Sequence, residues 1–311
     1  MLLFAAALAA AVTGTDISAA GPQGPLKGTF VDAGRGAPVV LILPGSGPTD
    51  RDGNNPMGIK AAPYRLLAEG LAAAGVSSVR IDKRGLFASA DAVADGNAVT
   101  LADYVTDTAA WIAATRARTG APCVWLLGHS EGGLIALAAA SAHTAGVCGL
   151  VLVATPGRPL AAVMREQLHA NPGNAPLLPA ADAAIDALNA GRHVDVATLP
   201  APLQPLFRAN VQGFLISLFA ADPARMAAAV WQLILIVQGE RDIQVGTADA
   251  TALKAAAPSA TLAMLPNVNH VLKLVESDSR GRNLATYADP NLPLAPAVVS
   301  TVVRFISGKY P

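Results

Sequence analysis

Short apolar runs, separated by stretches with a helical period, recur along the whole chain. Runs that suit strands lie at residues 38–43, 76–82, 123–127, 149–154, 233–238 and 261–265, with a weaker one at 28–31. Helical stretches lie between or after them at residues 63–74, 101–112, 134–142, 247–257 and 297–307. Short, wholly apolar runs are typical of strands buried on both faces of a sheet. Their alternation with helices predicts an α/β fold with a mostly parallel, doubly wound sheet.

This alternation is interrupted between residues 156 and 230. The segment contains two helical stretches, 160–169 and 180–189, separated by breaks with proline and glycine. It is too long and too apolar for an ordinary loop. We therefore predict a helical cap insert at 156–230 above a core made of residues 21–155 and 231–311.

Apolar residues near the end of this insert admit two interpretations. They are Phe207, Phe214, Leu215, Leu218 and Phe219. An apolar stripe can line a ligand pocket or form the packing face of a helix, and the spacing alone does not separate the two.

The first residues of the chain resemble a secretion signal. Residues 1–12 are almost wholly leucine, alanine and phenylalanine, a run too short to span a bilayer as a helix. Small residues follow, as they do before a signal cleavage site, although no lysine or arginine precedes the run. We predict a signal-like segment at 1–20, with cleavage before Gly21 and export from the cytoplasm. The alternative is an N-terminal helix retained on a cytoplasmic protein.

Composition narrows the classes of function. The chain has 311 residues, of which 52% are hydrophobic, and its 22 basic and 22 acidic residues cancel. Such a chain can bury a sizeable core. It lacks the excess of basic residues that binding to nucleic acid requires, so we expect no such partner. The sequence gives no oligomeric state.

The two cysteines leave a choice open. Cys123 and Cys148 each stand at the start of an apolar run. If the two strands are parallel neighbours, a disulfide is geometrically possible, and export would permit it. Two buried free thiols are an equally good interpretation. Neither cysteine has a histidine or cysteine at ligand spacing, so no metal site is expected.

The most informative stretch is Gly128-His129-Ser130-Glu131-Gly132. It reads G-x-S-x-G, and it lies between a buried strand and a small-residue helix. In this context the pattern predicts a nucleophile elbow, in which a sharp strand-to-helix turn exposes a serine hydroxyl. Ser130 is the predicted nucleophile; the alternative is a glycine-rich turn with an incidental serine.

A serine nucleophile needs a base and an acid that orients the base. In folds with this elbow the order along the chain is serine, acid, histidine. His270 is the only one of the five histidines that follows the last predicted strand, and it is the predicted base. Asp242 follows the strand at 233–238 and is the predicted acid, with Glu240 as its rival.

An acyl-transfer site also requires donors for the negative charge that develops on the substrate oxygen. The backbone N–H of Glu131, next after the nucleophile, is one expected donor. The loop after the strand at 38–43 contains Gly45-Ser46-Gly47, and its lack of bulky side chains allows close approach of its backbone. We predict the Ser46 N–H as the second donor of the oxyanion hole.

Two charged clusters lie near these motifs. The first is Asp50-Arg51-Asp52 and the second is Asp82-Lys83-Arg84. Either cluster could position a substrate. We favour ion pairs that brace the loops, because structural ion pairs are common.

Taken together, these motifs resemble the α/β-hydrolase superfamily, and in particular a bacterial serine carboxylesterase branch of it. The residues that carry the resemblance are the loop at 43–54, Asp82 to Gly85, the elbow at 128–133, Gly239 to Asp242 and Asn269-His270. The resemblance implies an enzyme without metal or organic cofactor that hydrolyses small, short-chain acyl esters through an acyl-enzyme. Two departures stand out: Pro44-Gly45 where many relatives have His-Gly, and Leu86-Phe87 where relatives commonly repeat a glycine.

Neither the fold nor the triad determines which leaving group the enzyme expels. A thioesterase, an amidase or peptidase, or an acyltransferase would use the same three residues. A ligand-binding protein without activity is an alternative of another class.

Overall fold

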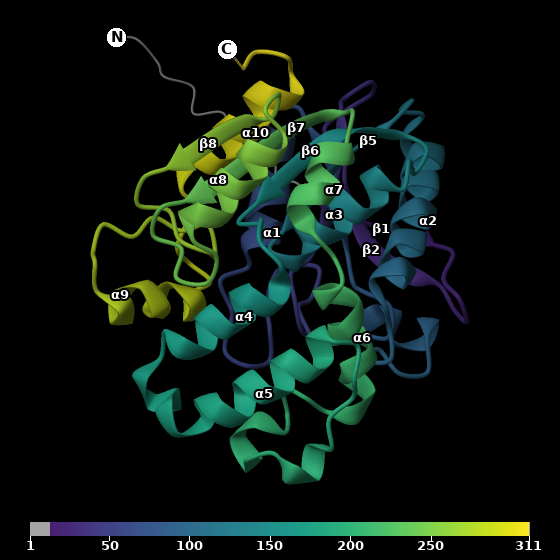
Figure 1. Ribbon diagram of the computed structural model, residues 1–311. Helices are drawn as coiled ribbons and strands as arrows, with labels where there is room; N and C mark the ends of the chain where they lie inside the picture. The colour runs from purple at the N-terminus through teal and green to yellow at the C-terminus, as the bar shows by residue number, and fades with distance from the viewer. Residues whose placement is uncertain (1–12, 311) are drawn as a thin grey trace.

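The computed structural model describes residues 13–310, and in this part of the chain eight strands form one sheet (Figure 1). Their order across the sheet is β1-β2-β4-β3-β5-β6-β7-β8. The strands are β1 (Thr15–Ala19), β2 (Leu26–Val31), β3 (Val39–Leu43), β4 (Ser77–Ile81), β5 (Val124–His129), β6 (Val147–Val153), β7 (Leu233–Gly239) and β8 (Thr261–Leu265). All neighbours from β4 to β8 are parallel, whereas β1 and β2 add an antiparallel edge.

Helices connect the strands and cover both faces of the sheet. The α-helices are α1 (Pro63–Ala73), α2 (Leu101–Thr119), α3 (Glu131–Ser141), α4 (Leu160–His169), α5 (Leu178–Asn189), α6 (Ala209–Phe219), α7 (Pro223–Ala229), α8 (Thr247–Ala256), α9 (Arg280–Ala285) and α10 (Pro296–Ile306). Short 3₁₀ turns are η1 (Phe87–Ala92), η2 (Pro172–Leu177), η3 (Val196–Thr198), η4 (Ala201–Leu203) and η5 (Thr286–Ala288). The predicted α/β fold is therefore confirmed.

The strands β3, β6 and β7 are almost wholly apolar because each face of the sheet supports its own core. Leu41 and Leu43 of β3 pack into the core with α2, α3 and α8, and Val40 and Ile42 pack into the core with α1 and α10. Consecutive side chains of a strand point to opposite faces. A doubly covered sheet thus requires the unbroken apolar runs seen in the sequence.

Residues 1–12 of the predicted signal-like segment lie outside the described residues. The end of that segment, Thr15–Ala19, forms β1 and pairs with β2, and its Ile17 and Ala19 side chains are buried. This edge strand belongs to the folded sheet.

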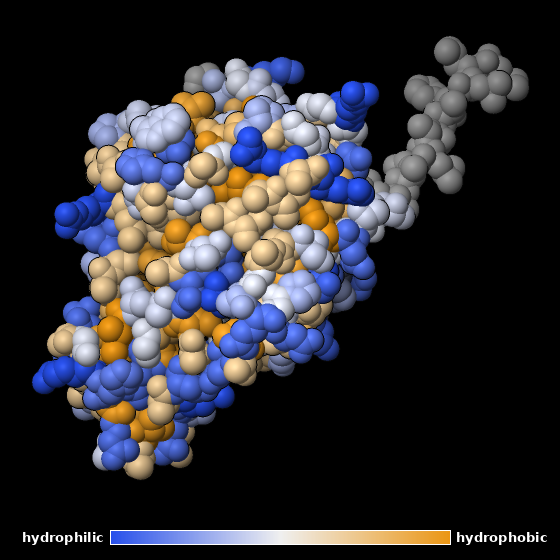
Figure 2. Space-filling model, turned by 90° about the vertical axis from the view of Figure 1, so that its right-hand side faces the viewer, coloured by the Kyte–Doolittle hydropathy of each residue, from blue (hydrophilic) through white to orange (hydrophobic). Residues whose placement is uncertain are grey.

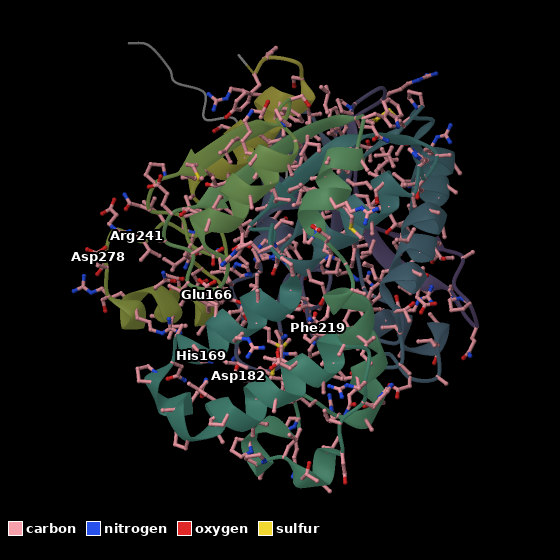
Figure 3. The ribbon with its side chains drawn as sticks, in the orientation of Figure 1. Glu166, His169, Asp182, Phe219, Arg241 and Asp278 are labelled. Carbon is pink, nitrogen blue, oxygen red and sulfur yellow. A yellow bond between two sulfur atoms is a disulfide. The ribbon has the colours of Figure 1, made fainter. Side chains whose placement is uncertain are left out.

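The segment between β6 and β7 forms α4, α5, α6 and α7. In Figure 1 the first three lie together below the sheet and contact one another. Polar contacts join α4 to α5. Asp182 forms an ion pair with Arg165 at 2.8 Å, and its carboxylate lies 3.0 Å from His169 Nε2; His169 and Asp182 face each other in Figure 3.

The apolar stripe of this segment is a packing face. Phe207, Leu215, Leu218 and Phe219 are all buried in the larger core. Phe214 lies edge-on to the Tyr104 ring of α2, with ring centroids 5.6 Å apart. The packing interpretation of the stripe is confirmed.

A disulfide joins Cys123 and Cys148. Cys123 directly precedes β5 and Cys148 is the second residue of β6, and the two strands are parallel neighbours. The disulfide therefore ties these two strands at the end of the sheet opposite the elbow.

The described surface intersperses apolar with hydrophilic residues, as the face in Figure 2 shows. Within residues 13–310, none of the helices has both the length and the apolarity needed to cross a bilayer.

Candidate active site

Ser130 occupies the sharp turn between β5 and α3. Its backbone has φ 54° and ψ −122°, a conformation that side-chain-bearing residues rarely adopt. The turn is possible because glycines flank it. A Cβ on Gly128 would lie 2.2 Å from the Gly132 carbonyl oxygen, and one on Gly132 would lie 2.1 Å from the Leu43 carbonyl oxygen. The predicted strand-turn-helix geometry is present, with Ser130 at its apex.

The structure brings Asp242 and His270 together. Asp242 Oδ2 lies 2.7 Å from His270 Nδ1, and the two side chains are 1% and 7% exposed. The other carboxylate oxygen accepts the backbone N–H groups of Gln244 and Val245 at 2.8 and 2.9 Å. Glu240, the rival acid, is exposed. The carboxylate thus fixes the proton of His270 on Nδ1 and leaves Nε2 free to act as a base.

The histidine loop lies directly against the elbow. His129 Nε2 is 2.8 Å from the backbone oxygen of His270, and the two imidazole rings lie 4.7 Å apart between centroids. Within the described residues no hydrogen bond joins Ser130 Oγ to His270 Nε2. In unliganded enzymes such a contact is often long and tightens only when substrate binds.

His129 holds a structural role that the sequence did not reveal. Its Nε2 must carry the proton, because the His270 carbonyl can only accept. Its Nδ1 therefore accepts from the hydroxyl of Tyr64, 2.9 Å away on α1. Burial lowers the pKa of His129 to about 3, and the nearby His270 adds to this shift. The ring is thus neutral at neutral pH.

The same tyrosine reaches the loop that follows β3 and contains Gly45 and Ser46, the candidate oxyanion loop. The Gly45 N–H donates to Tyr64 Oη at 3.0 Å, and burial raises the pKa of this hydroxyl. A continuous chain of hydrogen bonds therefore runs from Gly45 through Tyr64 and His129 to the backbone of His270.

The two predicted oxyanion donors are open. Within the described residues, neither the Ser46 N–H nor the Glu131 N–H has a hydrogen-bond partner. A Cβ on Gly45 would lie 3.3 Å from Ser130 Cβ, so the backbone that leads to Ser46 passes close to the elbow.

The charged clusters brace the loops around this site. Arg51 pairs with the buried Asp82 at 2.6 Å, and Arg80 pairs with Asp52 at 2.7 Å. In the second cluster Arg84 Nη2 lies 2.6 Å from Asp107 of α2. The brace interpretation is confirmed for Arg51, Asp52, Asp82 and Arg84. Lys83 differs, because it contacts the oxyanion loop itself.

Phe87 marks one of the two departures from the family pattern. Its φ is 48°, a left-handed conformation that glycine adopts without strain. The side chain is 42% exposed. The chain thus keeps the backbone geometry of a glycine at this position and adds an aromatic surface.

Residues 57–278 match the family model described as "Serine aminopeptidase, S33". The chain belongs to this family. The matched region covers more than half of the chain and includes Ser130, Asp242 and His270, whereas the loop with Ser46 lies before it. The family is one of serine hydrolases with the α/β-hydrolase fold, and the sheet and helices of this chain have that fold.

Solved structures agree on the fold. An esterase of Pyrococcus furiosus is similar with 15% identity, 96% of this chain and 93% of that chain covered, and a TM-score of 0.59. Est1E from Butyrivibrio proteoclasticus is similar with 16% identity and a TM-score of 0.58, with 96% of this chain and 99% of that chain covered. DcsB, solved in complex with its substrate analogue, is similar with 16% identity and a TM-score of 0.62, with 96% of this chain and 100% of that chain covered. No curated protein matches the chain in sequence.

Proposed function

We propose that the protein hydrolyses small carboxylic esters through an acyl-enzyme. In this proposal Ser130 is the nucleophile, His270 the general base, and Asp242 the acid that orients it. The N–H groups of Ser46 and Glu131 form the oxyanion hole. The observation that carries the proposal is the Asp242–His270 pair at 2.7 Å beside a strained serine elbow.

The reaction has two halves. Ser130 Oγ attacks the ester carbonyl while His270 Nε2 takes its proton, and the negative charge forms on the carbonyl oxygen. Collapse expels the alcohol, which receives the proton from His270. Water then attacks the acyl-enzyme with His270 again as base, which releases the acid and restores Ser130. Asp242 keeps the ring in the required tautomer and stabilises the imidazolium.

A phosphonate directed at serine tests this assignment. We expect it to modify Ser130 stoichiometrically, with loss of p-nitrophenyl ester hydrolysis, and we expect Ser130→Ala to be unreactive and inactive. Mass spectrometry of the digested protein identifies the modified residue. Full esterase activity in Ser130→Ala would end the proposal.

The family description favours a second candidate, an aminopeptidase. Such an enzyme must hold the positive amino terminus of its substrate, which calls for a carboxylate at the site. The buried carboxylates around the elbow already have basic partners: Asp82 pairs with Arg51, Glu131 with Lys83, and Asp242 with His270. This pairing supports the ester reaction, as does the description of two structures of similar fold as esterases.

A substrate panel separates the candidates. It comprises p-nitrophenyl esters, acyl thioesters and aminoacyl anilides, each compared by kcat/KM. We expect the esters to be preferred by at least about tenfold. Preference for the anilides would establish the aminopeptidase instead, whereas tight binding of esters without turnover would indicate a binding protein.

We further propose that α4 to α7 act as a cap that selects the acyl chain. They follow β6; α4, α5 and α6 lie together on one side of the sheet in Figure 1, and α7 leads back to the sheet beside α3 and α8. We expect kcat/KM to fall as the acyl chain of the ester lengthens. A series of p-nitrophenyl esters of increasing acyl length measures this profile; a flat profile would contradict selection of the acyl chain by these helices.

We also propose export, with a signal segment removed before Thr15. The apolar start of the chain and the Cys123–Cys148 disulfide support it, because disulfides persist in oxidising compartments. Cleavage before Thr15 would leave β1 in the sheet. N-terminal sequencing of the protein from its native host checks this, and an intact Met1 in a cytoplasmic fraction would contradict it.

A further inference from the structure

The side chain of Lys83 lies beneath the oxyanion loop, where solvent does not reach it. It follows β4 in the second charged cluster and is 4% exposed. Its Nζ donates to the carbonyl oxygen of Gly45 at 2.8 Å and lies 3.3 Å from Glu131 Oε1. The ring of Tyr104 lies 5.6 Å from the ammonium. One buried cation therefore contacts both parts of the expected oxyanion hole. It binds the carbonyl of Gly45, which precedes the donor Ser46, and it pairs with the side chain of Glu131, whose own N–H is the other donor.

The contact with Gly45 sets the direction of the Ser46 N–H. The Gly45 carbonyl and the Ser46 N–H belong to one planar trans peptide and point in opposite directions. Lys83 holds the carbonyl toward the interior, so the N–H points away from Lys83, toward the exposed side where Ser46 lies. Tyr64 fixes the other side of Gly45 by accepting its N–H. Rotation of the peptide between Gly45 and Ser46 would break the buried hydrogen bond from Lys83, while Tyr64 holds the preceding peptide between Pro44 and Gly45 in place.

The charge on Lys83 adds a second effect. A cation that donates to a peptide carbonyl polarises the peptide, and hydrogen bonds in such a chain strengthen one another. The Ser46 N–H thereby becomes a stronger donor toward the negative substrate oxygen. The same cation offsets the buried Glu131 carboxylate, which would otherwise oppose negative charge beside the elbow.

We propose that Lys83 is a positioning residue for the oxyanion hole, which rests on the proposed ester hydrolysis. It holds the peptide between Gly45 and Ser46 in the orientation that stabilises the transition state, and it touches neither substrate nor reacting atoms. Its effect should therefore fall on transition-state binding, with little effect on binding of the ester in its ground state.

The test removes the lysine without leaving a buried charge alone. Lys83→Met/Glu131→Gln is compared with Glu131→Gln, so the difference isolates Lys83. We expect kcat/KM for a p-nitrophenyl ester to fall by about 10- to 100-fold, less than complete loss of one donor, with KM changed by less than about threefold. The Ki of a trifluoromethyl ketone with the same acyl chain should rise by the same factor, because its adduct places an oxyanion in the hole.

Lys273 supplies a matched control. It is also fully buried and also donates to a backbone carbonyl, that of Leu292. Lys273→Met should lower Tm while kcat/KM and the ketone Ki stay within about twofold. If the Lys83 double variant does not fold, Lys83→Gln/Glu131→Gln replaces it, since glutamine retains a donor without the charge; a loss of at least about threefold in kcat/KM is then expected.

The outcomes separate the explanations. A lower Tm with unchanged kcat and ketone Ki would overturn the positioning role and make Lys83 a structural lysine. An equal kinetic loss in Lys273→Met would also overturn it, because the effect would then reflect general destabilisation. Absence of ester turnover and of Ser130 labelling in the unaltered protein would instead defeat the proposed function, and this inference with it.

Discussion

The two ends of the parallel sheet are held together in different ways. At the amino-terminal end a single covalent bond, Cys123–Cys148, ties β5 to β6. At the carboxyl-terminal end the loops are joined by hydrogen bonds and ion pairs alone, including Tyr64–His129 and Lys83–Gly45. The covalent bond lies at the end of β5 and β6 away from Ser130, and the polar contacts orient the groups that would react.

The two ends of the sheet therefore have different roles, one in stability and one in catalysis. A disulfide acts mainly on the unfolded ensemble and needs no precise alignment with a substrate. Buried hydrogen bonds orient individual atoms, as positioning of a catalytic group requires. Changes at the carboxyl-terminal end should therefore alter rate, and changes at the amino-terminal end should alter stability alone.

The largest effect should come from Asp242→Asn. The amide keeps the size of the side chain but no longer fixes the proton of His270 on Nδ1, so kcat should fall about 10,000-fold with Tm changed by a few degrees at most. Glu240→Gln, an exposed change in the same turn, is the control and should leave kcat within about twofold. A larger loss in the glutamine variant would transfer the acid role to Glu240.

The disulfide should show the opposite behaviour. Its two cysteines are 25 residues apart in sequence, and loss of a bond that closes a loop of this size costs about 3 kcal/mol of unfolding free energy. Cys123→Ala/Cys148→Ala should therefore unfold at lower urea concentration, with kcat/KM unchanged within about twofold. A matching fall in kcat/KM at a temperature where the variant is folded would contradict the claim that the amino-terminal end affects stability alone.

The sequence predicted those parts of the site that depend on strand ends. Asp242 and His270 each follow a strand that the apolar pattern locates, and parallel strands deliver such residues to one edge. The elbow follows from glycines at fixed spacing around Ser130. The contact between Asp242 and His270 is thus a consequence of the sheet topology, which the alternation of strands and helices already predicts.

Contacts between side chains on distant elements were not predictable in this way. Tyr64 lies on a helix, 65 residues from its partner His129, and a buried aromatic residue on a helix face usually signals packing alone. The sequence predicts only an ion-pair brace for Lys83, because a contact with the backbone carbonyl of Gly45 leaves no pattern in the sequence. The antiparallel strand β1 falls within the segment interpreted as a signal.

Tyr64→Phe should have an intermediate effect. The ring packing is kept, but the Gly45 N–H and His129 Nδ1 lose their shared buried partner, which costs about 2 kcal/mol of unfolding free energy. We also expect a lower kcat, because the oxyanion loop is then fixed on one side only. Tyr287→Phe is the control: its hydroxyl accepts from the Gln244 side chain at 3.1 Å, and its loss should cost less than about 1 kcal/mol. Equal losses of stability in both variants would show that the hydrogen bonds linking Gly45, Tyr64 and His129 stabilise the protein no more than an ordinary tyrosine contact.

The last effect concerns His129 and is absent at neutral pH, because it develops only in acid. Burial lowers its pKa from 6.5 to about 3, so below pH 6.5 the unfolded chain takes up a proton that the native ring does not. Stability from this residue is therefore complete above pH 6.5 and falls by about 1.4 kcal/mol per pH unit as the pH drops toward 3. Urea unfolding at pH 7 and pH 5 should show this fall in the parent protein and a shallower one in His129→Asn, which has no imidazole to titrate. If the two proteins lose stability in parallel, His129 is not held neutral, and the chain from Gly45 to His270 does not constrain its proton.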